Sequence, residues 1–190
     1  MNVPTVIVAT PRAIKILLIR HTEKPDGSNA GVSPSGAADE KSLTVGGWQR
    51  AGALVCLFAP PEGSPRNPVL ASPRFIFASH SSSRRPEQSV RPLAAKLGIQ
   101  VNLDFGKGDE GRMVLAAKGC EGVVLISWQH EYMAAVANAI LGDKHTAPQV
   151  WPKDRFDVVW IFDFVPLAGR YTFTQLPQRL LARDSTSVII

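Results

Sequence analysis

Histidine and arginine side chains follow three apolar runs of this 190-residue chain. The runs, each with the residues that come after it, are ILLIRHTEKP, FIFASHSSSRRPEQS and VVLISWQHE. A site that moves a phosphoryl group needs fixed donors around the peripheral oxygens and a nucleophile in line with the leaving oxygen. Arginine supplies forked donors for such oxygens, and histidine can supply a further donor or a nucleophile. The first run is followed by Arg20 and His21, the second by His80, Arg84 and Arg85, and the third by His130.

The apolar runs have the character of strands that are buried on both faces of a sheet. Segments with helical features lie between them, so we expect helices over residues 43–59 (with Thr44 as the N-cap), 84–98, 110–118 and 131–142. This alternation predicts an α/β fold, a three-layer sandwich with a mainly parallel central sheet and helices on both faces. Ligands bind beyond the C-terminal ends of such strands, so the histidines and arginines should converge on one crevice.

Two further apolar stretches near the C-terminus, FDVVWIFDF and RYTFTQL, predict a hairpin over about 156–176. Its outer strand could pair with another subunit, so the oligomeric state is left open and a homodimer is one alternative. The length and the single strand–helix series favour one domain over residues 1–190.

The composition favours a soluble globular protein, with 45% hydrophobic and 19% charged residues. The net charge is +5, but the basic residues are scattered, which favours a mixed solvated surface and not a nucleic-acid partner. Cys56 and Cys120 are far apart and predict no disulfide. The segment VPTVIVAT is too short for a signal peptide, and no apolar stretch approaches a membrane span. We expect a cytoplasmic protein with no membrane partner.

Four stretches resemble, in order, the sequence signatures of the histidine phosphatase superfamily, also called phosphoglycerate-mutase-like. They are LIRHTEKP, LTVGGWQRA, SSSRRPEQS and VVLISWQHE, and the resemblance spans about residues 14–142. The Arg-His-x-Glu-Lys-Pro stretch at 20–25 is similar to that of a bacterial subgroup of small members. Thr22 stands where many members have glycine, and so does Glu131.

The resemblance implies a metal-independent phosphomonoester hydrolase that needs no cofactor and acts on a small phosphorylated substrate. It makes His21 the nucleophile, through a phosphohistidine intermediate, and makes Arg20, Arg85 and His130 the phosphate-binding residues. Arg85 is preferred to Arg84 because it stands three residues before Gln88, as in the family's turn. We expect no metal site, because adjacent arginines would repel a cation.

Two carboxylates could deliver a proton to the leaving oxygen. Glu110 lies where the mutase branch of the superfamily places its glutamate, and Glu131 lies where the acid-phosphatase branch places an aspartate. We prefer Glu110 slightly. Both residues stand at predicted helix N-termini, where the dipole favours the ionised form and a purely structural role is an alternative.

Two other functions remain as alternatives to a phosphatase. One is a phosphoglycerate-type mutase, and the other is a non-catalytic domain that binds a phosphorylated ligand on the same fold. Mutases of the superfamily are generally longer, with inserted segments that cover the pocket. The stretch from Arg85 to His130 is short here, which favours hydrolysis by water.

Overall fold

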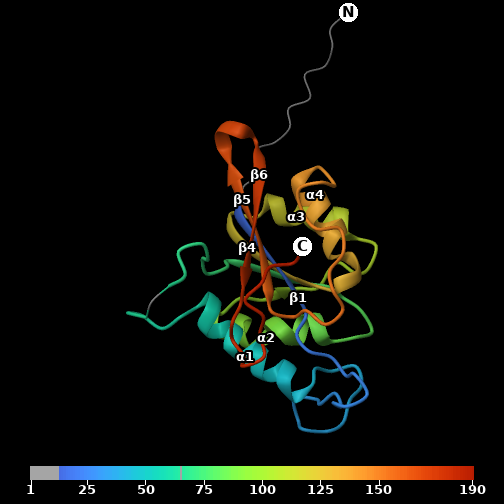
Figure 1. The fold of residues 1–190 in the computed structure, drawn as a ribbon. Coiled ribbons are helices and arrows are strands. Elements are labelled where there is room, and N and C mark those ends of the chain that lie inside the picture. The colour runs from blue at the N-terminus through green and yellow to red at the C-terminus, as the bar shows by residue number, and fades with distance from the viewer. Residues whose placement is uncertain (1–12, 65) are drawn as a thin grey trace, which may run out of the picture.

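A six-stranded sheet forms the centre of the molecule (Figure 1). The computed structural model describes residues 13–64 and 66–190, so the segment considered above as a signal peptide lies outside the described residues. The strands are β1 (Ala13–Arg20), β2 (Phe75–Ala78), β3 (Val101–Asn102), β4 (Gly122–Trp128), β5 (Val158–Val165) and β6 (Arg170–Pro177). Their order is β3-β2-β4-β1-β5-β6. The first four strands are parallel, whereas β5 is antiparallel to both of its neighbours, β1 and β6.

Helices cover both faces of this sheet (Figure 1). They are α1 (Val45–Phe58), α2 (Arg85–Leu97), α3 (Glu110–Gly119) and α4 (Met133–Leu141), the last preceded by a 3₁₀ turn at His130–Tyr132. Leu17 and Ile19 of β1 pack in the core on the α1 and α2 side, whereas Ile16 and Leu18 pack on the α3 and α4 side. The predicted three-layer α/β sandwich with a mainly parallel sheet is confirmed.

The helix ends follow local sequence signals. The Thr44 hydroxyl accepts a hydrogen bond from the Gly47 amide at 3.1 Å, which caps α1 as predicted. Gly98 ends α2 with a φ of 65°, a conformation that favours glycine. Pro92 lies inside α2, which nevertheless continues to Leu97.

The C-terminal hairpin is confirmed, with β5 antiparallel to both β1 and β6. Strand β5 begins at Val158, two residues later than the apolar pattern indicates. Strand β3 was not predicted, because its two residues are too few to show a periodic pattern. Within the described ranges, no helix has both the length and the apolar character that crossing a bilayer requires.

Candidate active site

A cavity of about 400 Å³ lies at the C-terminal ends of β1, β2 and β4. Its lining residues are His21, Lys24, His80, Ser81, Ser82, Ser83, Arg85, Lys107, Gln129, His130 and Glu131. Four of the six predicted site residues are therefore brought together here. Arg20 and Glu110 are buried and do not line the cavity surface.

His21 is buried next to the end of β1 and is held in one tautomer. Its Nδ1 lies 2.8 Å from the carbonyl oxygen of Thr22, and because a carbonyl only accepts, Nδ1 carries the proton. Burial lowers the pKa of His21 to about 3; the Thr22 carbonyl opposes this shift, and the charges of Arg20, Arg85 and Lys24 add to it. The ring is therefore neutral at physiological pH, and Nε2 keeps the lone pair that a nucleophile needs.

Arg20 is oriented by the segment that precedes β5. Its Nη1 donates to the carbonyl oxygens of Pro152, Lys153 and Arg155 at 3.2, 2.7 and 2.9 Å, and its guanidinium carbon lies 3.7 Å from the centroid of the Phe156 ring. Burial lowers the pKa of Arg20 to about 10, so the side chain remains charged. Its Nε and Nη2 are buried and have no partner in the described part of the chain. These two N–H groups lie on one edge of the planar guanidinium, a fork that fits two phosphate oxygens.

Arg85 and the adjacent Arg84 have different surroundings. Arg85 lines the cavity, donates from Nη1 to the Glu40 carbonyl oxygen at 3.0 Å, and has a buried Nε without a partner among the described residues. Arg84 is more exposed and forms an ion pair with Asp39. Of these two arginines, the structure thus brings Arg85 and not Arg84 to the cavity lining.

His130 and Glu131 lie next to each other at the start of the turn after β4. The His130 Nδ1 is 3.0 Å from the Glu131 Oε2. Burial is the largest cause that lowers the pKa of His130, and the positive charge of Arg20 adds to it. Burial raises the pKa of Glu131. Its own backbone N–H and the charges of His130, Lys107 and Lys24 outweigh burial, and they lower the pKa overall.

The environment of Glu110 differs from that of Glu131, because Glu110 does not line the cavity. It is 8% exposed, and its Oε1 accepts hydrogen bonds from the Trp128 indole nitrogen at 3.1 Å and from the Gly108 amide at 3.2 Å. These contacts fix the start of α3 against the end of β4.

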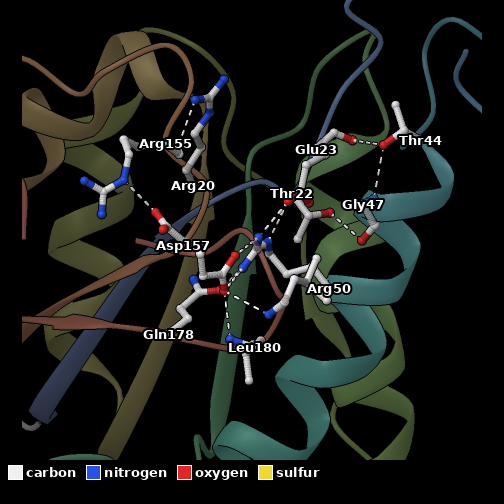
Figure 2. A network of polar contacts seen from close by, with 12 residues as sticks. Arg20, Thr22, Glu23, Thr44, Gly47, Arg50, Arg155, Asp157, Gln178 and Leu180 are labelled. Carbon is white, nitrogen blue, oxygen red and sulfur yellow. Dashed lines mark hydrogen bonds and ion pairs between the residues drawn. The ribbon is translucent and has the colours of Figure 1, made fainter. Parts of the chain in front are cut away.

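Gly47, Gln88 and Ser89 belong to the family-like motifs and hold the loop between β1 and α1 in place. The Thr22 amide donates to the Ser89 hydroxyl at 2.8 Å. The Thr22 hydroxyl donates to the Gly47 carbonyl oxygen at 2.9 Å (Figure 2). A Cβ atom at Gly47 would lie 2.5 Å from the Glu23 carbonyl oxygen, so this position requires glycine. The side chain of Gln88 accepts from the Leu43 amide at 3.0 Å.

A buried ionic network extends from this loop to the C-terminal segment (Figure 2). Arg50 of α1 is 3% exposed and donates to the Glu23 carboxylate at 2.7 and 2.9 Å, to the Asp184 carboxylate at 2.6 and 2.9 Å, and to the Gln178 side-chain oxygen at 3.1 Å. Burial lowers the pKa of Arg50, but the hydrogen bonds to Asp184 and Glu23 raise the pKa by a larger amount, so the net shift is upward. The network fixes the position of Glu23, two residues after His21.

Sequence reasoning missed several residues at the site. Lys107 and Gln129 line the cavity, and Gln129 donates to the Ser79 hydroxyl at 2.8 Å. The place of Gln129 directly before His130 could have identified it as a cavity residue. Lys107 lies in a loop whose sequence has no pattern that would point to a site. Among the described residues, no group of three or more histidine, cysteine, aspartate or glutamate side chains could hold a metal ion.

No protein-family model and no curated protein matches this sequence. Solved structures do match. The protein histidine phosphatase SixA complexed with tungstate is 15% identical, with a TM-score of 0.52 and coverage of 86% of this chain and 97% of that chain. An Escherichia coli K-12 protein, proposed to be an alpha-ribazole-5'-P phosphatase, is 14% identical, with a TM-score of 0.57 and coverage of 90% and 98%. The chain therefore has the histidine phosphatase fold, also called phosphoglycerate-mutase-like.

Proposed function

We propose that this protein is a cytoplasmic phosphomonoesterase that acts on a small phosphorylated substrate through a phosphohistidine on His21. One observation carries the proposal: a neutral histidine with a free Nε2 lies in a cavity beside buried arginine N–H groups that have no partner in the described residues. Buried donors are nearly always paired in proteins, so donors left free around a nucleophile fit an anionic ligand. The fold, shared with phosphatases, supports the same activity.

In the first step the Nε2 lone pair of His21 attacks phosphorus, an N–P bond forms, and the bond from phosphorus to the leaving oxygen breaks. The free edge of Arg20, together with Arg85 and His130, holds the peripheral oxygens and stabilises their charge. The imidazole is neutral before the attack and becomes cationic afterwards. Its Nδ1 keeps its proton and stays hydrogen-bonded to the Thr22 carbonyl oxygen, which keeps the ring in position.

Glu131 supplies the proton that the leaving oxygen needs. It lines the cavity, whereas Glu110 lies outside the lining and is bonded to the Trp128 indole. Burial raises the pKa of Glu131 in the free protein, but its own backbone N–H and the surrounding positive charges outweigh burial and lower the pKa overall. A bound phosphate carries negative charge next to this carboxylate and raises its pKa, so protonation accompanies substrate binding.

In the second step water attacks the phosphohistidine and Glu131 takes the proton from that water. The N–P bond breaks, inorganic phosphate forms, and His21 returns to its neutral form. Glu131 gives up this proton when the phosphate leaves, so each group ends the cycle in the state in which it began.

The test is release of inorganic phosphate from phenyl phosphate in the presence of a chelator. We expect the wild-type chain to be active, His21→Ala to be inactive, and His145→Ala, a change at an exposed histidine, to keep wild-type activity. Activity in His21→Ala equal to that of the wild type would show that His21 is not the nucleophile. Phosphoglycerate isomerisation without phosphate release would favour a mutase, and phosphate binding without turnover would favour a binding domain.

A further inference from the structure

A second cavity, of about 750 Å³, adjoins the candidate active site. Lys24 lines both cavities, so they are neighbours in space. Four segments form the second cavity: the loop at 23–29, the start of α1 at 44–50, the segment at 153–157 and the C-terminal turn at 181–184. The proposed reaction assigns no role to this space.

The size of this cavity is that of a ligand site. Pockets that bind small molecules commonly have volumes of about 300–1,000 Å³. The phosphoryl group itself belongs in the smaller cavity, beside His21 and Arg85. The larger cavity therefore provides room for the part of a substrate that leaves after transfer of the phosphoryl group to His21.

The charges around the second cavity are mixed. Lys24, Lys153 and Arg183 contribute positive charge, and Asp26 and Asp154 contribute negative charge. A strongly charged leaving group of either sign would meet groups of its own sign here, which is unfavourable. The lining thus fits a leaving group that is polar but carries no net charge.

The unpaired groups of this lining show what kind of polar group fits. Oε1 of Glu23 accepts both hydrogen bonds from Arg50, whereas Oε2 is buried and has no partner among the described residues. Lys24, the residue after Glu23, offers N–H donors, and Phe156 provides an apolar wall of the cavity. A hydroxyl group can donate to the carboxylate and accept from the ammonium, so a compound with several hydroxyl groups satisfies both.

We propose that this second cavity binds the leaving group of the substrate and that this leaving group is neutral, polyhydroxylated and larger than a monosaccharide. The proposal rests on the proposed phosphatase function and adds the class of substrate to it. The substrate class is thus a phosphorylated oligosaccharide or glycoside, with the phosphate at His21 and the distal sugar between α1 and the C-terminal turn.

The test compares kcat/KM for three substrates: phenyl phosphate, glucose 6-phosphate and the disaccharide phosphate trehalose 6-phosphate. Ala182→Trp fills the cavity from the C-terminal turn, and Gln49→Trp fills it independently from α1; both residues are exposed and line the cavity. The matched control is Ala168→Trp, at an exposed position in the turn of the C-terminal hairpin. Circular dichroism checks that all three variants are folded.

We expect the wild type to prefer the disaccharide phosphate over glucose 6-phosphate by about tenfold or more, a difference of about 1.4 kcal/mol. Both cavity-filling variants should remove this preference by lowering kcat/KM for the disaccharide phosphate most, and the control should behave as the wild type. Equal kcat/KM for the two sugar phosphates, or an equal loss on all substrates in the filled variants, would overturn the inference while the phosphatase proposal stands. Failure of the wild type to hydrolyse phenyl phosphate would overturn both.

Discussion

Two arginines at the candidate site leave three buried donor nitrogens without a partner in the described part of the chain: Nε and Nη2 of Arg20, and Nε of Arg85. An unpaired buried donor costs about 1–3 kcal/mol, so such groups normally find a partner. Nη1 of Arg20 has three carbonyl partners, which shows that the absence of partners is confined to one edge of this guanidinium. A phosphate bound at that edge would satisfy donors that the fold itself leaves unpaired.

Replacement of Arg85 by lysine tests whether a fork of donors is required. A lysine keeps the charge but cannot donate from two parallel N–H groups, so Arg85→Lys should lower kcat/KM by about tenfold or more. Arg84→Lys is the matched control and should stay within about twofold, because this exposed side chain pairs with Asp39 at the surface. If Arg84→Lys showed the larger loss, the phosphate ligand would be Arg84.

The neutral state of His21 predicts a pH dependence of stability. Its pKa in the folded chain is about 3, against about 6.5 for an unperturbed histidine. Between these values the unfolded chain binds a proton that the folded chain does not, so stability falls as the pH falls below about 6.5. Urea unfolding at about pH 7.5 and about pH 4.5 should show that the wild type loses about 2–3 kcal/mol more than His21→Gln. Equal losses in the two chains would show that His21 is not held neutral.

The segment at 152–157 is the element that orients Arg20, and no sequence motif points to it. Its contacts to Arg20 come from backbone carbonyl oxygens, which every residue type carries, so the pattern of side chains contains no signal. Asp157 anchors the segment, because its carboxylate accepts from Arg155 Nε at 2.7 Å and from the Ser185 amide at 2.6 Å. The C-terminal region therefore contributes to the site even though the family-like motifs end near residue 142.

Phe156 is expected to act as a positioning residue for Arg20. Phe156→Leu removes the ring that lies under the guanidinium, so inhibition by inorganic phosphate should weaken by about threefold or more, with a larger effect on KM than on kcat. Phe156→Tyr should restore the inhibition. Phe173→Leu, which removes a ring packed on Trp160 and Phe162, is the matched control and should leave it unchanged. Equal phosphate inhibition in Phe156→Leu and the wild type would refute the role.

For the whole molecule, the sequence predicted what depends on periodic patterns and chain direction. The apolar runs identified β1, β2 and β4, and the rule that parallel strands share one ligand-binding edge brought His21, Arg85 and His130 together. The choice between Glu110 and Glu131 could not be made in this way, because both stand at helix starts and only packing decides which carboxylate faces the cavity. The Arg50 network was equally inaccessible, since Asp184 is 134 residues away along the chain.

That network should contribute strongly to the stability of the whole chain. Arg50→Met leaves the Glu23 and Asp184 carboxylates without their cation, so the free energy of unfolding should fall by about 3 kcal/mol or more. Arg84→Met removes an exposed partner of Asp39 and should cost about 0–1 kcal/mol. Urea unfolding monitored by circular dichroism measures both. Unchanged stability in Arg50→Met would show that the network does not hold the C-terminal segment in place.

The central claim is that a phosphoryl group is carried by His21, and trapping this intermediate tests it most directly. The chain is mixed with phenyl phosphate, quenched in alkali, which preserves phosphohistidine, digested, and analysed by mass spectrometry. We predict a phosphoryl group on His21 in the wild type and none in His21→Ala. Phosphate release without a phosphorylated His21, or a phosphoryl group on His130 instead, would contradict the account.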